Sequence, residues 1–159
     1  MPINQSEFQA FLGLSVTLTG FTEFQLQGTG QAELYFSTVA GIVGEATMSE
    51  LLKAFSHVQT HAEGDVARLN KLLRVEILSD DKLGPIARNI IKLWYVGTWY
   101  QLPHAWRESF GVKDNDITFI PSPLSYTEGL LWPAIGSHPA GAKAPGYGTW
   151  SGPPQIPAV

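Results

Sequence analysis

The chain has 159 residues, enough to bury one hydrophobic core, and its net charge of −4 argues against nucleic-acid binding, which needs a basic patch. It has no cysteine, so disulfides, thiolate catalysis, Cys-ligated zinc and iron–sulfur clusters held by this chain are excluded. Only 15% of its residues are charged, against about 25% in typical soluble domains, and 44% are hydrophobic. This composition suits a subunit with a large interface.

The first half of the chain has apolar residues at helical spacing. A first helix is expected over residues 8–18, with Ser6 as its N-cap and Gly20 as its stop. A second helix is expected over residues 32–42, ended by the glycines at 41 and 44. The sequence of residues 47–50 (TMSE) has the form of a capping box, which predicts that a third helix begins there.

The middle of the chain predicts two further long helices. Gly64 and Asp65 break the chain before a fourth helix over residues 66–78. A fifth helix over residues 85–98 is apolar almost all the way round, with Arg88 and Lys92 as its one polar line. Such a helix is either the centre of the bundle or is covered on one side by a partner. A short helix is also expected over residues 104–110.

Beyond residue 111 the composition changes, because most of the eleven prolines lie there and the segment from 129 to 159 carries one Lys or Arg, Lys143. A brief extended segment is expected over residues 117–120, and one or two helical turns over residues 126–132. The predicted fold is therefore mainly α, a compact bundle of about five helices with an extended C-terminal wrap. In this division, residues 1–110 form the helical domain and residues 111–159 pack on it and on a partner.

Several possible catalytic or binding motifs are incomplete. His57 and His61 share a helix face and could bind a metal, but no third ligand has a diagnostic spacing. Residues 28–33 (GTGQAE) loosely match a dinucleotide fingerprint without the preceding strand that it needs, so a turn before a helix is the simpler interpretation. No nucleophile elbow accompanies His104 or His138. The sequence thus predicts no catalytic, cofactor-binding or metal-binding residue in this chain.

All five tryptophans lie between Trp94 and Trp150. Large aromatic side chains are enriched at protein interfaces, where a broad apolar area is buried while a polar atom keeps its partner. Trp94 is expected in the core of the helical domain. The residues predicted at a partner interface are Trp99, Tyr100, Tyr126, Trp132, Tyr147 and Trp150.

Four segments, in the right order along the chain, resemble the small subunit of membrane-associated, FAD-dependent sugar and polyol dehydrogenases of the sorbitol dehydrogenase type. They are residues 11–20 (FLGLSVTLTG), 90–97 (IIKLWYVG), 125–132 (SYTEGLLW) and 145–150 (PGYGTW).

The resemblance implies a non-catalytic role. In that family a large flavoprotein subunit of the glucose-methanol-choline oxidoreductase class binds FAD and oxidises the sugar, and a cytochrome c subunit often passes the electrons on. The helical small subunit binds the large one and supports its maturation. Family members often carry a twin-arginine export signal, which implies a periplasmic, membrane-associated complex. This sequence has no Arg-Arg pair, no signal peptide near Met1 and no apolar stretch of membrane-spanning length.

Two alternatives remain open at this point. One is a free-standing carbohydrate-binding module that stacks aromatic side chains on a sugar. The other is an unrecognised hydrolase, which would depend on one of the four histidines: His57, His61, His104 or His138.

Overall fold

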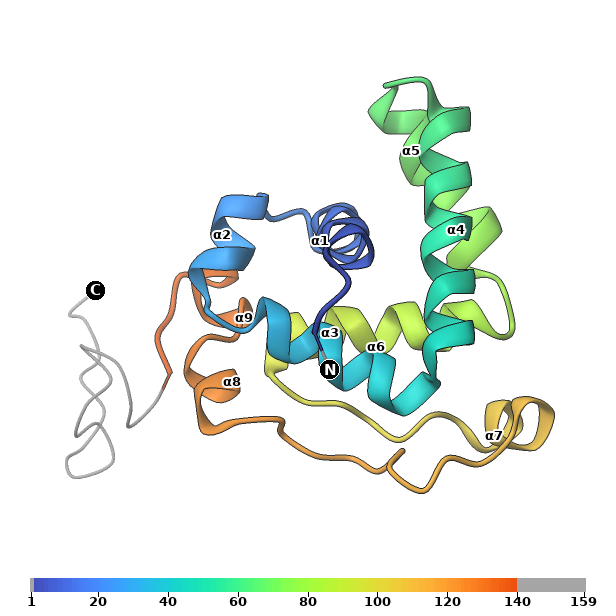
Figure 1. Cartoon of the computed structure of the whole chain (residues 1–159). Coiled ribbons are helices and arrows are strands. Elements are labelled where there is room, and N and C mark those ends of the chain that lie inside the picture. Colours follow the sequence, from blue (N-terminus) through green and yellow to red (C-terminus); the bar gives the residue numbers. More distant parts are fainter. Residues whose placement is uncertain (1, 140–159) are drawn as a thin grey trace, which may run out of the picture.

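The structure, a computed structural model, describes residues 2–139 (Figure 1). The described chain is mainly helical and contains no strand, which confirms the predicted fold class. Its elements are α1 Gln5–Thr19, α2 Glu23–Gly28, α3 Ala32–Val43, α4 Glu45–Ala62, α5 Val66–Leu72, the π-helix η1 Leu73–Leu78, α6 Leu83–Val96, α7 His104–Phe110, α8 Pro123–Thr127 and α9 Leu131–Ala134. Besides the five helices expected for the bundle, the described chain has α7, which was expected, α8 and α9 near the helical turns expected over residues 126–132, and α2, which was not expected. The fourth expected helix becomes a π-helix at Leu73.

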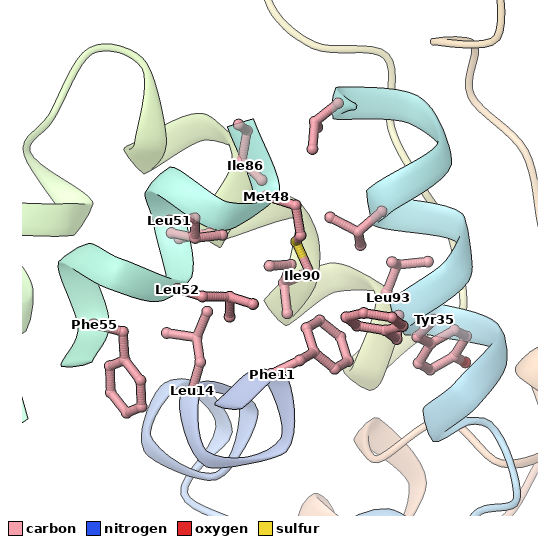
Figure 2. Close-up of a cluster of buried hydrophobic side chains, with 14 of the residues drawn as sticks. Phe11, Leu14, Tyr35, Met48, Leu51, Leu52, Phe55, Ile86, Ile90 and Leu93 are labelled. Carbon is pink, nitrogen blue, oxygen red and sulfur yellow. The ribbon is translucent and has the colours of Figure 1, made fainter. Parts of the chain in front are cut away.

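Helix α6 lies at the centre of the bundle, which is one of the two places that its apolar sequence allows. It contacts α1, α3, η1, α8 and α9, and its exposed side carries the predicted polar line of Arg88 and Lys92. Trp94 is 1% exposed, which confirms its place in the core. Figure 2 shows the apolar side chains that α1, α3, α4 and α6 bring together, among them Phe11, Leu14, Tyr35, Met48, Leu51, Leu52, Phe55, Ile86, Ile90 and Leu93.

Two predicted helix starts are wrong in detail. Helix α1 is capped by Asn4, whose side-chain oxygen accepts hydrogen bonds from the backbone N–H groups of Ser6 and Glu7, so the predicted cap Ser6 lies inside the helix. Helix α4 begins at Glu45, directly after α3, and Thr47 is therefore in its first turn rather than at its cap. Both helices therefore begin at an earlier residue than predicted. The predicted stop at Gly20 is confirmed.

The sequence analysis missed helix α2. Its N-terminus carries a complete capping box: the Thr22 hydroxyl accepts from the Gln25 N–H, and the Gln25 side chain accepts from the Thr22 N–H. Leu26 is fully buried and holds this short helix against the rest of the chain.

The predicted fourth helix is present but divides into α5 and the π-helix η1. At the end of η1, the Arg88 guanidinium donates a hydrogen bond to the Leu78 carbonyl at 2.8 Å.

After α6 the chain runs to α7 and returns along the same side of the bundle to α8 and α9 (Figure 1). The outgoing and returning segments meet at one antiparallel bridge between Trp99 and Phe119, which agrees with the extended segment expected over residues 117–120. Farther on, the hydroxyls of Ser122 and Ser125 both donate to the side-chain oxygen of Gln31. The described part of the C-terminal segment is thus attached to the helices by specific polar contacts.

Candidate functional site

A groove with a volume of about 420 Å³ lies between α2 and the segment that carries α8 and α9. Figure 1 shows these elements together at the end of the molecule away from α7. The groove is lined by Phe21, Gln25, Gly28, Thr29, Thr127, Glu128, Gly129, Leu130, Trp132, Pro133, Ser137, His138 and Pro139. A second hollow of the same volume, between the end of α3 and residues 112–115, has no aromatic lining. The first groove is therefore the better candidate for a binding site.

One wall of the groove is α2, and the local sequence of this helix explains why the side chain of Phe24 is exposed. The capping box starts the helix at Glu23, and Leu26 provides its buried anchor. Phe24 is two residues before Leu26 and points away from the core, so its side chain is 88% exposed. An isolated exposed apolar residue is ordinary on a protein surface, and Phe24 adds a large apolar surface next to Gln25, which lines the groove.

The other wall is held on α6. The Leu130 N–H donates to the Trp94 carbonyl at 2.9 Å, which ties the start of α9 to the central helix. The rings of Tyr126 and Trp132 meet edge to face with centroids 5.7 Å apart, and the Trp132 indole N–H donates to the Tyr126 carbonyl at 2.9 Å. The Trp132 ring thus has a fixed orientation at the groove without any bound ligand.

The predicted interface residues divide into three groups. Trp132 lines the groove, and the ring of Tyr126 contacts it edge to face. Tyr100 lies elsewhere, partly exposed, with the Lys92 ammonium 4.9 Å from the centre of its ring. Tyr147 and Trp150 lie outside the described residues.

Trp99 requires a correction, because it is 0% exposed and belongs to the interior of this chain. Its indole N–H donates to Asp116 Oδ1 at 2.9 Å, and the same carboxylate accepts from the Leu102 N–H. Asp116 is itself buried, so the three groups form an internal polar network. The indole of Trp99 already has its polar partner, and the residue no longer belongs among the interface candidates.

A buried polar cluster stands behind the groove, where Tyr35 of α3 is close to α8. Burial raises the pKa of the Tyr35 hydroxyl above 10.0, a hydrogen bond with Ser125 lowers it in part, and the nearby Glu128 carboxylate raises it further. The hydroxyl is therefore protonated at neutral pH. It is a hydrogen-bonding group that helps to position α8, rather than a proton-transfer group.

The elements that form the groove carry no Lys or Arg. Residues 1–52 contain five carboxylates and residues 114–139 contain three, and neither range has a basic Lys or Arg side chain. All Lys and Arg of the described chain lie from Lys53 to Lys113, on α4 to α7 and their connections. Of these carboxylates, Glu23 belongs to α2 and Glu128 lines the groove.

The candidate catalytic residues do not assemble into a recognisable site. The rings of His57 and His61 lie 4.0 Å apart, with Glu76 3.8 Å from His57, yet no group of three potential metal ligands occurs among residues 2–139. His104 pairs with Glu108 at 3.0 Å. Gly28 ends α2, and a turn leads from it into α3. Residues 28–33 are therefore a turn before a helix, as the simpler interpretation of the GTGQAE sequence predicted.

No family model, curated protein or solved structure matches this chain. In the described range, no helix is both long enough and apolar enough to cross a membrane. The function of the groove is therefore inferred from the residues that line it. The partner-interface role expected for Tyr126 and Trp132 stays a prediction. Helix α2 was not expected from the sequence, although the Thr22 and Gln25 pair that caps it is a recognisable signal.

Proposed function

We propose that this chain is a non-catalytic small subunit that binds, stabilises and helps to mature the FAD-containing catalytic subunit of a sugar or polyol dehydrogenase. The observation that carries the proposal is the groove between α2 and α9 with the exposed Phe24 beside it. The four motifs that resemble the small-subunit family supply the identity of the partner, a flavoprotein of the glucose-methanol-choline oxidoreductase class.

The physical basis of the proposed stabilisation is burial of aromatic surface. Covering a side chain as large as phenylalanine contributes roughly 2 kcal/mol, so Phe24 and the exposed parts of Trp132 and Ile135 provide several kcal/mol of gross interaction energy. Part of that energy is lost to the entropy of association. The Trp132 ring is already held by its hydrogen bond to Tyr126, so little is lost in fixing its orientation.

In this proposal the flavin and the substrate site belong to the partner, and this chain binds no cofactor itself. A cytochrome c subunit as electron acceptor and a periplasmic, membrane-associated location belong to the proposal as well, because the family resemblance implies both. The substrate is selected by the flavoprotein.

The direct test is co-expression of the chain with the flavoprotein encoded beside it, followed by size exclusion with the flavin absorbance recorded across the peak. The proposal predicts one peak that contains both chains and the flavin. Separate elution of a well-behaved monomer would contradict it.

A shortened chain tests the predicted role of Tyr147 and Trp150. Deletion of residues 140–159 removes both aromatic residues, and urea unfolding of the shortened and the full chain shows whether the fold is a matched background. If the tail contributes to the interface, the shortened chain co-elutes with the flavoprotein less completely than the full chain. Unchanged co-elution would remove Tyr147 and Trp150 from the interface.

A second candidate is the free-standing carbohydrate-binding module. It is favoured by one observation: the aromatic side chain of Trp132 lines the groove together with the polar side chains of Gln25 and Thr127. Aromatic stacking beside a few placed polar groups is typical of small-ligand sites. Titration of the isolated chain with glucose, fructose and sorbitol, followed by tryptophan fluorescence, distinguishes the two: a saturable change without any partner supports the binding module.

A further inference from the structure

The segment that carries α8 and α9 is attached to the bundle differently from the segment before it. In this strap, residues 122–139, Leu130 is the one residue that belongs to the hydrophobic core. The preceding segment, residues 97–119, contributes three large side chains to the core: Trp99, Leu102 and Trp106. Few buried apolar contacts are typical of a part of a protein that opens more readily than the rest.

Polar groups of the bundle lie beneath the strap. The Leu130 N–H donates to the Trp94 carbonyl at 2.9 Å, and the hydroxyls of Ser122 and Ser125 donate to Gln31 Oε1. When the strap leaves, water can hydrogen-bond to the carbonyl and the amide that it uncovers. The free energy lost with each of these bonds is therefore the small net difference between a protein partner and a water partner.

Two glycines let the strap lie with its backbone directly against the end of α6. A Cβ added at Gly97 would overlap the Ser125 carbonyl oxygen, and a Cβ added at Gly129 would lie 2.7 Å from the Tyr95 carbonyl oxygen. At these two points the strap and α6 meet through backbone atoms rather than through interlocking side chains. Separation at these points needs no repacking of the helices beneath.

The chain is held firmly just before the strap. Trp99 and Phe119 exchange two backbone hydrogen bonds, each at 2.9 Å, and the Trp99 indole N–H donates to the buried carboxylate of Asp116. Ile120 follows directly and is 55% exposed, and Pro121 leads from it into the strap. Residues 120–121 thus lie between a fixed bridge and a lightly held segment, which is where a hinge would be placed.

We propose that the strap undocks from the bundle about a hinge at residues 120–121 while α1 to α6 stay folded, and that this movement opens and closes the groove. Residues between 21 and 29 line one side of the groove, and strap residues between 127 and 139 line the other. Undocking removes the second side. A molecule that occupies the groove binds the docked state alone and shifts the population toward it.

The movement is a property of the chain by itself, so its test needs no partner and does not depend on the proposed function. Native-state hydrogen exchange of the full chain, resolved by residue with NMR, measures the equilibrium between closed and open states. The Leu130 N–H is expected to be about a hundredfold or more less protected than the N–H of Ile90 in the middle of α6. The Phe119 N–H should stay better protected than that of Leu130, because its bridge lies before the hinge.

A mild substitution in the bundle separates undocking from unfolding of the whole chain. Ile77 is fully buried on η1, which stays folded when the strap is undocked. Ile77→Val should therefore lower the protection of Ile90 about threefold or more and leave that of Leu130 unchanged. Equal losses at Leu130 and Ile90 would show that the strap leaves only when the bundle unfolds, and would overturn the proposal.

A substitution in the strap has a different signature. Gly129→Ala raises the free energy of the docked state itself, so it should lower the protection of Leu130 and Ile90 by the same factor, about tenfold or more. Gly41→Ala is the matched control, because neither glycine has a positive φ and no atom lies within 4 Å of a Cβ added at Gly41. It should leave the protection of Leu130 unchanged. Unchanged protection of Leu130 in Gly129→Ala would contradict docking of the strap on α6.

Discussion

Two aromatic regions of this protein use the same kind of side chain in opposite ways. Trp99 donates its indole N–H to the buried carboxylate of Asp116, 17 residues later, and so joins two distant segments inside the molecule. Trp132 donates its indole N–H to the carbonyl of Tyr126, six residues earlier, and so shapes a local surface. In this molecule the hydrogen-bond partner of the indole, and not aromatic composition, separates a tryptophan that holds the fold together from one that presents a surface.

The largest effect on stability is expected from a substitution of Gly97, where the end of α6 contacts the segment that carries α8. It ends α6 with φ +66°, and a Cβ added there would lie 2.2 Å from the Ser125 carbonyl oxygen, next to α8. Gly97→Ala should therefore lower the free energy of unfolding by about 3 kcal/mol or more, from the strained backbone and the overlap together. Urea unfolding measures this effect.

Gly20 supplies the matched control for that substitution. It ends α1 in the same left-handed conformation, with φ +78°, but nothing lies near its added Cβ. Gly20→Ala should cost about 1 kcal/mol, the backbone contribution alone. Equal losses for the two variants would show that the close contact of α6 with the C-terminal segment does not stabilise the fold.

The comparison is sharpened by making one substitution in both regions. Trp99→Phe leaves the buried Asp116 without one of its donors and leaves space in the interior, so it should cost about 3 kcal/mol of unfolding free energy. Trp132→Phe keeps a ring at the groove and loses one local hydrogen bond, which should cost about 1 kcal/mol. Thermal or urea unfolding compares them, and a larger loss for Trp132→Phe would reverse the assignment of the two regions.

The smallest expected effect is on the pH dependence of stability. Because burial raises the pKa of Tyr35 in the folded chain, the unfolded chain releases this proton first as the pH rises through 10.0. The free energy of unfolding therefore falls with rising pH in that range. Tyr35→Phe should show a shallower alkaline decline, measured by urea unfolding between neutral and alkaline pH. An identical slope in the two proteins would mean that Tyr35 makes no such contribution.

Much of the helical framework was predictable because its signals are local. The short helix α7 has the expected bounds, set by Pro103 before it and Gly111 after it. The apolar sequence of α6 left two places open for it, the centre of the bundle or a partner-covered face, and its contacts decide for the centre. The start of α1 was less predictable, since Asn4 and Ser6 are both good capping residues and only the hydrogen bonds decide between them.

The candidate site was predictable only in part. Tyr126 and Trp132 are six residues apart in a segment rich in Gly and Pro, so their common place could be expected from the sequence. Trp99 could not be placed in this way, because its partner Asp116 comes from a segment on the far side of α7. The groove needs α2, and that helix is separated from α9 by about a hundred residues of chain, a long-range contact that periodicity does not reveal.

The central claim is that this chain is needed by a flavoprotein partner. The most direct measurement is the FAD content per molecule of that flavoprotein, purified after production with this chain and after production without it. High FAD loading and dehydrogenase activity are expected from the preparation with this chain, and poor loading from the preparation without it. Equal loading in the two preparations, with the chain eluting apart from the flavoprotein, would contradict the account.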